Sequence, residues 1–148
     1  MNNVNYAGIL LISADMRYIL LAAESDSGLY SDFGGSAEDG ETPRETALRE
    51  AWEESCAVIT RDTLETRRHI FTLATPSSIH YVVVTPTRTC YLLNEAYSLV
   101  RACGTPAASP CMEKKKARWF ALSNYRKNKM RPEFIRSLEL LSQLVAQL

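Results

Sequence analysis

Three glutamates, Glu50, Glu53 and Glu54, stand at positions i, i+3 and i+4 of a segment whose pattern predicts a helix. This spacing places all three carboxylates on one face within a single turn. Like charges at such spacings destabilise a helix by ~0.2–0.5 kcal/mol per pair. A solvated acidic face is one interpretation. Because a Gly34-Gly35 turn precedes the helix, a divalent cation such as Mg²⁺ or Mn²⁺, which prefers several carboxylate oxygens, explains the cluster better.

The charges divide into an acidic and a basic segment, although 17 Lys+Arg balance 17 Asp+Glu over the chain. Residues 24–54 hold ten acidic and two basic residues, whereas residues 113–131 hold eight basic residues and one acidic residue. These segments are either two solvated faces or a metal-collecting region opposite a phosphate-collecting one. Zero net charge argues against a generally basic nucleic-acid binder.

The length of 148 residues and the apolar fraction of 46% predict one domain over residues 1–148. No apolar run approaches the ~20 residues that a membrane span needs, and no basic leader precedes the stretch from Ala7 to Ser13. We therefore expect no membrane association and a cytoplasmic location, with secretion after removal of a leader left open.

The cysteines argue against a structural zinc site, because no two of them form a C-x-x-C pair. We expect them to be reduced, although Cys103 and Cys111 could close a loop in a secreted protein. The four cysteines are Cys56, Cys90, Cys103 and Cys111.

The remaining pattern predicts an α/β fold, with a mixed sheet packed between helices. Thr42, Pro43 and Glu45 form a capping box that begins a helix over residues 43–56. Pro132 begins a last helix, with Ile135, Leu138, Leu141, Val145 and Leu148 on one face. Apolar alternation predicts a hairpin over residues 5–23, strands at His69–Thr75, Ile79–Thr85, Thr89–Leu93 and Lys116–Leu122, and loops over 24–41 and 104–110.

Residues 35–57 resemble the Nudix box, G-x5-E-x7-R-E-U-x-E-E-x-G-U, where U is aliphatic. The matching positions are Gly35, Glu41, Arg49, Glu50, Glu53 and Glu54. The resemblance implies an α/β/α sandwich and a hydrolase that cleaves the pyrophosphate of a nucleoside diphosphate linked to another moiety.

The chain departs from the box at Cys56, where the family has glycine, and at Ala57. That glycine usually ends the helix at positive φ, a conformation that costs a residue with a side chain ~1 kcal/mol. Either the helix ends differently here or the strain is tolerated. No catalytic carboxylate is lost, so we expect activity to survive.

The resemblance also implies a role for each matching residue. Glu50, Glu53 and Glu54 would hold Mg²⁺ or Mn²⁺, with Glu53 or Glu50 as general base. The Gly34 carbonyl would complete the coordination. Structural roles within the motif would fall to Gly35, Glu41 and Arg49, the last two locking the loop to the helix.

Nudix enzymes often carry a further acid ahead of a tryptophan-containing strand. Glu113, six residues before Trp119, is our candidate for this ligand or base. A solvated loop glutamate is the alternative.

The resemblance implies a small-molecule phosphoanhydride as substrate, and three classes of function remain open. Residues 33–35, Trp119-Phe120 and Pro132-Glu133 resemble MutT-type enzymes, which favours a nucleoside triphosphate. Alternatively, Lys114, Lys116 and Arg118, expected on one strand face and followed by Trp119, would bind a diphosphoinositol polyphosphate or an RNA 5′ cap. A solubilising role at the edge of the sheet, without ligand binding, is the alternative interpretation of these basic residues.

A non-catalytic binding module is the third class of function, which the intact carboxylates disfavour. The sequence leaves the oligomeric state open.

Overall fold

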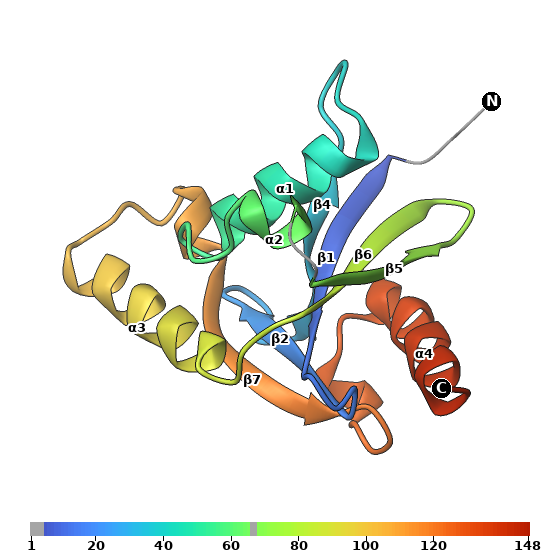
Figure 1. The fold of residues 1–148 in the computed structure, drawn as a ribbon. Helices are drawn as coiled ribbons and strands as arrows, with labels where there is room; N and C mark the ends of the chain where they lie inside the picture. Colours follow the sequence, from blue (N-terminus) through green and yellow to red (C-terminus); the bar gives the residue numbers. More distant parts are fainter. Residues whose placement is uncertain (1–4, 66–67) are drawn as a thin grey trace.

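A mixed sheet of seven strands lies between helices in this computed structural model, which describes residues 5–65 and 68–148 (Figure 1). The sheet order is β3-β2-β1-β6-β5, with β4 paired to β1 and β7 paired to β2. The elements are β1 (Tyr6–Ile12), β2 (Tyr18–Glu24), β3 (Tyr30–Ser31), β4 (Phe33–Ser36), α1 (Pro43–Glu54), α2 (Asp62–Glu65), β5 (His69–Ala74), β6 (Ser78–Val84), α3 (Thr89–Ala102), the 3₁₀ turn η1 (Pro110–Met112), β7 (Lys114–Ala121), the 3₁₀ turn η2 (Lys127–Lys129) and α4 (Pro132–Ala146).

Strand β1 organises the sheet, because it pairs with three other strands. Its first half is antiparallel to β4, from Tyr6 opposite Ser36 to Ile9 opposite Phe33. Its end is antiparallel to β2, and along its whole length it runs parallel to β6. The pairing with β4 brings the chain that leads into α1 next to the centre of the sheet.

Two apolar clusters cover the two faces of the sheet. Successive residues of β1 point to opposite faces, so Ile9 and Leu11 lie in one cluster and Leu10 and Ile12 in the other. The first cluster packs against α1 and α3, and the second packs against α4 (Figure 1). The expected α/β/α sandwich is confirmed.

Helix α1 begins and ends with defined caps. The Thr42 hydroxyl accepts a hydrogen bond from the Glu45 N–H at 3.2 Å, and the Glu45 carboxylate accepts one from the Thr42 N–H at 3.0 Å. At the other end the Ala57 N–H donates to the Trp52 carbonyl at 2.8 Å, as in a Schellman motif. Cys56 and Ala57 have φ of 53° and 66°. The chain therefore keeps the left-handed helix end without a glycine.

Two of the predicted elements are wrong. Part of the loop expected over residues 24–41 forms β3 and β4, because their partners β2 and β1 supply pairing that local composition does not show. The strand expected at Thr89–Leu93 is the start of α3. Threonine and aromatic residues near its start favour a strand locally, but Leu93 and Tyr97 are buried at helical spacing.

The other predicted elements are found, with shifted ends. The hairpin, the two strands after residue 68 and α4 lie where the pattern placed them, and β7 begins at Lys114 rather than Lys116. Leu148 was expected on the buried face of the last helix, but it lies beyond α4 and is 81% exposed. None of the helices in the described ranges has the length and hydropathy of a membrane span.

Replacing Ala57 by glycine should raise the free energy of unfolding by about 1 kcal/mol, because glycine adopts positive φ without steric cost. Urea unfolding measures the change. The matched control is Ala107→Gly, at an exposed position outside the left-handed region, which should lower stability slightly by loosening the unfolded chain. Equal losses in both variants would show that the helix end is unstrained.

Candidate active site

Arg49 fastens the loop after β4 to α1. Its guanidinium donates to the Glu41 carboxylate from Nε at 2.8 Å and from Nη2 at 3.0 Å. Nη2 also donates to the Ser36 carbonyl at 3.0 Å, and Nη1 donates to Glu50 Oε1 at 2.9 Å. The hydrogen bonds from Arg49 lower the pKa of Glu41 to about 2. The loop thus has one fixed position relative to the helix.

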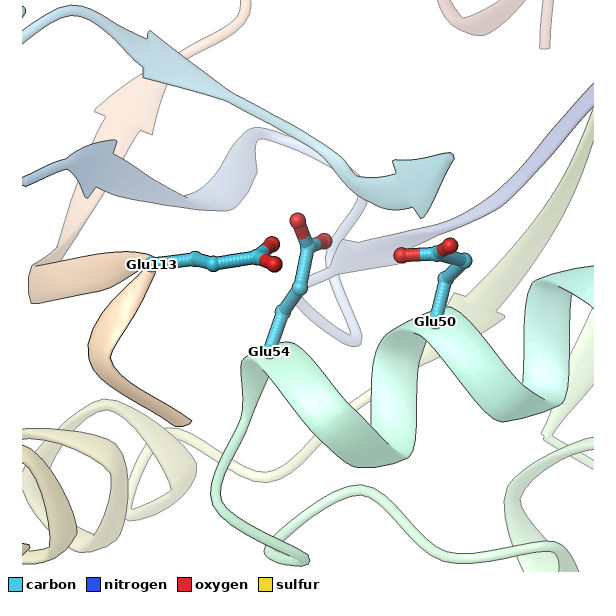
Figure 2. A group of neighbouring side chains, drawn as sticks. All are labelled: Glu50, Glu54 and Glu113. Carbon is cyan, nitrogen blue, oxygen red and sulfur yellow. The ribbon is translucent and has the colours of Figure 1, made fainter. Parts of the chain in front are cut away.

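Glu50 and Glu54 of α1 meet Glu113, which follows η1 and directly precedes β7. One carboxylate oxygen of each lies within 4.8 Å of the others. Figure 2 shows Glu54 between the other two, with Glu113 reaching it from a separate segment. Glu53 was expected beside them, but it stands outside this group, with Oε2 3.5 Å from Arg49 Nη1. The residues at i and i+4, Glu50 and Glu54, therefore share the site, whereas the residue at i+3, Glu53, does not.

The Glu54 carboxylate is buried against the sheet, with the residue 7% exposed. Its Oε1 accepts a hydrogen bond from the Gly34 N–H at 2.9 Å. Burial raises the pKa of Glu54 well above its usual range, and the nearby charge of Lys114 opposes this effect. Burial also raises the pKa of Glu50.

This donor set fits a divalent cation. Two partly or fully buried carboxylates at such short separation repel each other when ionised, and a cation between them removes that cost. Hard oxygen donors suit Mg²⁺ or Mn²⁺, which also retain water ligands. The residues that could hold the ion are Glu50, Glu54 and Glu113.

The two glycines before α1 allow the loop and the helix to approach closely. A Cβ on Gly35 would lie 2.6 Å from Glu50 Oε1. A Cβ on Gly34 would lie 2.8 Å from both the Cα of Gly8 and the carbonyl oxygen of Ala7 on β1. A side chain at position 35 would displace the Glu50 carboxylate, and one at 34 would part the strands.

The basic residues of β7 do not share one face, so that prediction is wrong. Glu24 pairs with Lys114 and Ala23 with Lys116, which leaves an extra residue, Lys115, as a β-bulge. Lys114 turns inward and is 2% exposed, and its Nζ donates to Ser31 Oγ at 2.6 Å.

Lys116 and Arg118 are exposed, as a role in binding phosphate would require. The guanidinium of Arg118 lies 5.2 Å from the centre of the Phe120 ring. Trp119 is partly buried against the α1–α3 cluster, and its Nε1 donates to the Thr87 carbonyl at 3.4 Å.

A buried polar group that the sequence analysis missed lies on the α4 face. Asp32 Oδ2 is 2.6 Å from His80 Nε2, and Oδ1 accepts a hydrogen bond from the Tyr6 hydroxyl at 2.8 Å. Burial disfavours the charge of Asp32, but His80 lowers its pKa. The three residues border a cavity of about 270 Å³ that Arg131 and Phe134 also line. The feature of the sequence that could have indicated this group is His80, a histidine within the apolar run of residues 79–84.

The chain matches the family model of the NUDIX domain over residues 3–141, and it belongs to this family. Membership of this family supports a pyrophosphate hydrolase of the Nudix type. Nudix hydrolases generally use a divalent metal, and they act on small nucleotide-linked molecules. A search of curated proteins finds no match to the chain.

Solved structures share the fold with this chain at low identity. A bifunctional NMN adenylyltransferase/ADP ribose pyrophosphatase from Francisella tularensis, complexed with AMP and a Mn ion, has a TM-score of 0.59 and 18% identity, over 97% of this chain and 42% of its own. This chain thus spans less than half of that protein.

Two further structures also match with TM-scores of 0.59. An Ap4A hydrolase from C. elegans is 16% identical over 98% of this chain and 99% of its own. The Nudix hydrolase RenU from M. smegmatis is 16% identical over 100% of this chain and 90% of its own. At these identities the likeness concerns the fold alone.

Gly35→Ala should lower the turnover number by about 100-fold or more, because a misplacement of ~1 Å at a reactive centre costs this much. The new Cβ displaces only the end of the flexible Glu50 side chain, so the fold should survive. Turnover and thermal unfolding are measured together, with Ser36→Ala, at the exposed next residue, as control. Full activity in Gly35→Ala would contradict the assigned position of Glu50.

Proposed function

We propose that the chain hydrolyses a pyrophosphate linkage of a nucleoside triphosphate, as MutT-type enzymes do. The observation that carries this proposal is the meeting of Glu50, Glu54 and Glu113 from two separate segments beside Gly34. We assign these three residues to Mg²⁺ or Mn²⁺, with Glu53 and the Gly34 carbonyl as further ligand candidates. When bound, such an ion neutralises phosphate oxygens and lowers the pKa of water.

Glu53 is the first candidate for general base. Its carboxylate stands outside the group of three and is partly exposed, so it is open to an attacking water. Glu50, the second candidate, accepts a hydrogen bond from Arg49 at 2.9 Å, which is shorter than the 3.5 Å hydrogen bond from Arg49 to Glu53. The base would take a proton from the water as it attacks phosphorus.

The cavity on the α4 face supports a substrate with a nucleoside part. The rings of Tyr6, His80 and Phe134 line it, and Arg131 offers hydrogen-bond donors. Of these three rings, only that of Tyr6 belongs to a partly exposed residue. Asp32, which borders this cavity, is close enough to the acidic group for its charge to raise the pKa of Glu54.

A polyanionic substrate is the second candidate. Lys116 and Arg118 are exposed on β7, a strand that in the described part of the chain pairs only with β2. They could bind the phosphates of a diphosphoinositol polyphosphate or the 5′ cap of RNA. Lys114 gives this candidate less support than the sequence suggested, because its ammonium group is buried. Family membership and the intact carboxylates oppose a non-catalytic binding module.

We also propose that residues 1–148 form one Nudix hydrolase domain. A cytoplasmic location is our proposal for the protein, since a reducing compartment keeps free thiols such as those of its four cysteines stable.

Glu53→Gln should lower the turnover number by two or more orders of magnitude, since the loss of a general base or metal ligand costs about 10²–10⁴-fold. Hydrolysis of a panel of nucleoside triphosphates is measured over a Mg²⁺ titration, and excess chelator should abolish it. Glu95→Gln, on the exposed side of α3, is the matched control and should be unaffected. Full activity in excess chelator would exclude the metal assignment, and an unfolded variant would point to a structural role for Glu53.

The double variant Lys116→Ser/Arg118→Ser separates the two substrate classes. For a nucleoside triphosphate we expect KM to change only a few-fold at low and high salt. A steep rise in KM that weakens with added salt would favour the polyanion, because exposed charges are screened over ~8–10 Å at ordinary ionic strength. Arg126→Ser/Lys129→Ser removes the same charge from exposed positions outside β7 and serves as control.

A further inference from the structure

Two cysteines from distant parts of the chain meet beside the acidic group. Cys56 Sγ lies 3.2 Å from the carbonyl oxygen of Cys111, across a separation of 55 residues. Burial raises the pKa of the Cys56 thiol to about 11, and the neighbouring Cys111 adds to this rise. Cys56 stands at the position where the Nudix box has glycine, and it has positive φ there.

Both thiols border one apolar hollow of about 360 Å³, which Trp52 and Pro110 also line. Cys56 and Cys111 are each partly exposed. A small solute can therefore reach the pair from solvent.

The pair connects the two segments that supply the acidic group. Cys56 follows Glu54 by two residues, and Cys111 precedes Glu113 by two. Figure 2 shows the carboxylates of Glu54 and Glu113 facing each other from these segments. A bond between the cysteines would join the end of α1 to η1.

We propose that Cys56 and Cys111 form a reversible disulfide when the protein meets an oxidised low-molecular-weight thiol such as glutathione disulfide. One cysteine thiolate attacks a sulfur of glutathione disulfide, forms a mixed disulfide and releases one glutathione thiolate. The second cysteine loses its proton to solvent, attacks the protein sulfur of the mixed disulfide and releases the other glutathione. Two protein thiols are oxidised, and one glutathione disulfide is reduced to two glutathiones.

The disulfide would act as a clamp on the position of Glu113. Closing a loop of this length restricts the unfolded chain, so the oxidised protein should melt roughly 10 °C higher than the reduced one. The chemistry of the pair does not depend on the proposed function. Only an effect of the clamp on hydrolysis rests on it.

The test is oxidation of the full chain in glutathione buffers of increasing disulfide content, followed by thiol blocking and mass spectrometry of a non-reduced digest. We expect loss of two thiols, a Cys56–Cys111 cross-link and the rise in melting temperature, all reversed by dithiothreitol. Cys103→Ser and Cys90→Ser, matched controls at the other two cysteines, should still form the cross-link.

Two variants should lose the cross-link and the rise in melting temperature. They are Cys111→Ser and Cys56→Gly, and the second restores the residue of the Nudix box and relieves positive φ, so it should fold. Retention of four thiols in the wild type, or a cross-link between Cys103 and Cys111, would overturn the proposal. Since neither readout needs catalysis, an inactive but cross-linked protein would contradict only the proposed function.

Discussion

The buried carboxylate of Glu54 is the constraint around which the site is built. A carboxylate loses most of its hydration on burial, so it needs hydrogen bonds and opposite charge nearby. The Gly34 N–H and the charge of Lys114 supply part of this. The N–H can reach Glu54 only because β4 lies along β1, where glycines at positions 8 and 34 face each other. The pairing of β1 with β4 at the centre of the sheet therefore supplies a hydrogen bond to this carboxylate in addition to packing the strands together.

Arg49 offsets the electrostatic cost of placing several acidic side chains near the C-terminus of α1. The end of a helix dipole disfavours negative charge there, and the described part of α1 has no basic residue in its last turn. The guanidinium of Arg49 pairs with four carboxylates, so one cation is shared among Glu38, Glu41, Glu50 and Glu53. This sharing keeps Glu50 oriented towards Glu54 while the loop carrying Glu41 is held in place. The Nudix box thus contains both acids of α1 that belong to the acidic group and the arginine that offsets their repulsion.

The features that the sequence predicted are those that local spacing determines. The capping box begins α1 at Pro43, and the spacing of Glu50 and Glu54 brings their carboxylates together. What the sequence could not show depends on contacts between distant segments. Strand β4 exists because β1 accepts it, and α3 is recognised only over a window longer than its strand-like start. The burial of Lys114 follows from one extra residue in β7, a bulge that no local pattern marks.

Lys114 connects the two faces of the sheet electrostatically. Its charge lowers the pKa of Asp32, which faces the α4 cavity, and it also opposes the rise in the pKa of Glu54 on the α1 side. A single buried ammonium group therefore stabilises the charged forms of two buried acids. Removing it would leave both carboxylates without this opposite charge. Such a residue cannot also reach out to a phosphate on the surface. Of the predicted set Lys114, Lys116 and Arg118, two cations are then exposed in place of three, although Lys115 of the same strand is exposed as well. The cavity beside Asp32 is a second guide to the substrate. For this reason we propose a compact nucleotide, rather than an extended polyanion, as the substrate.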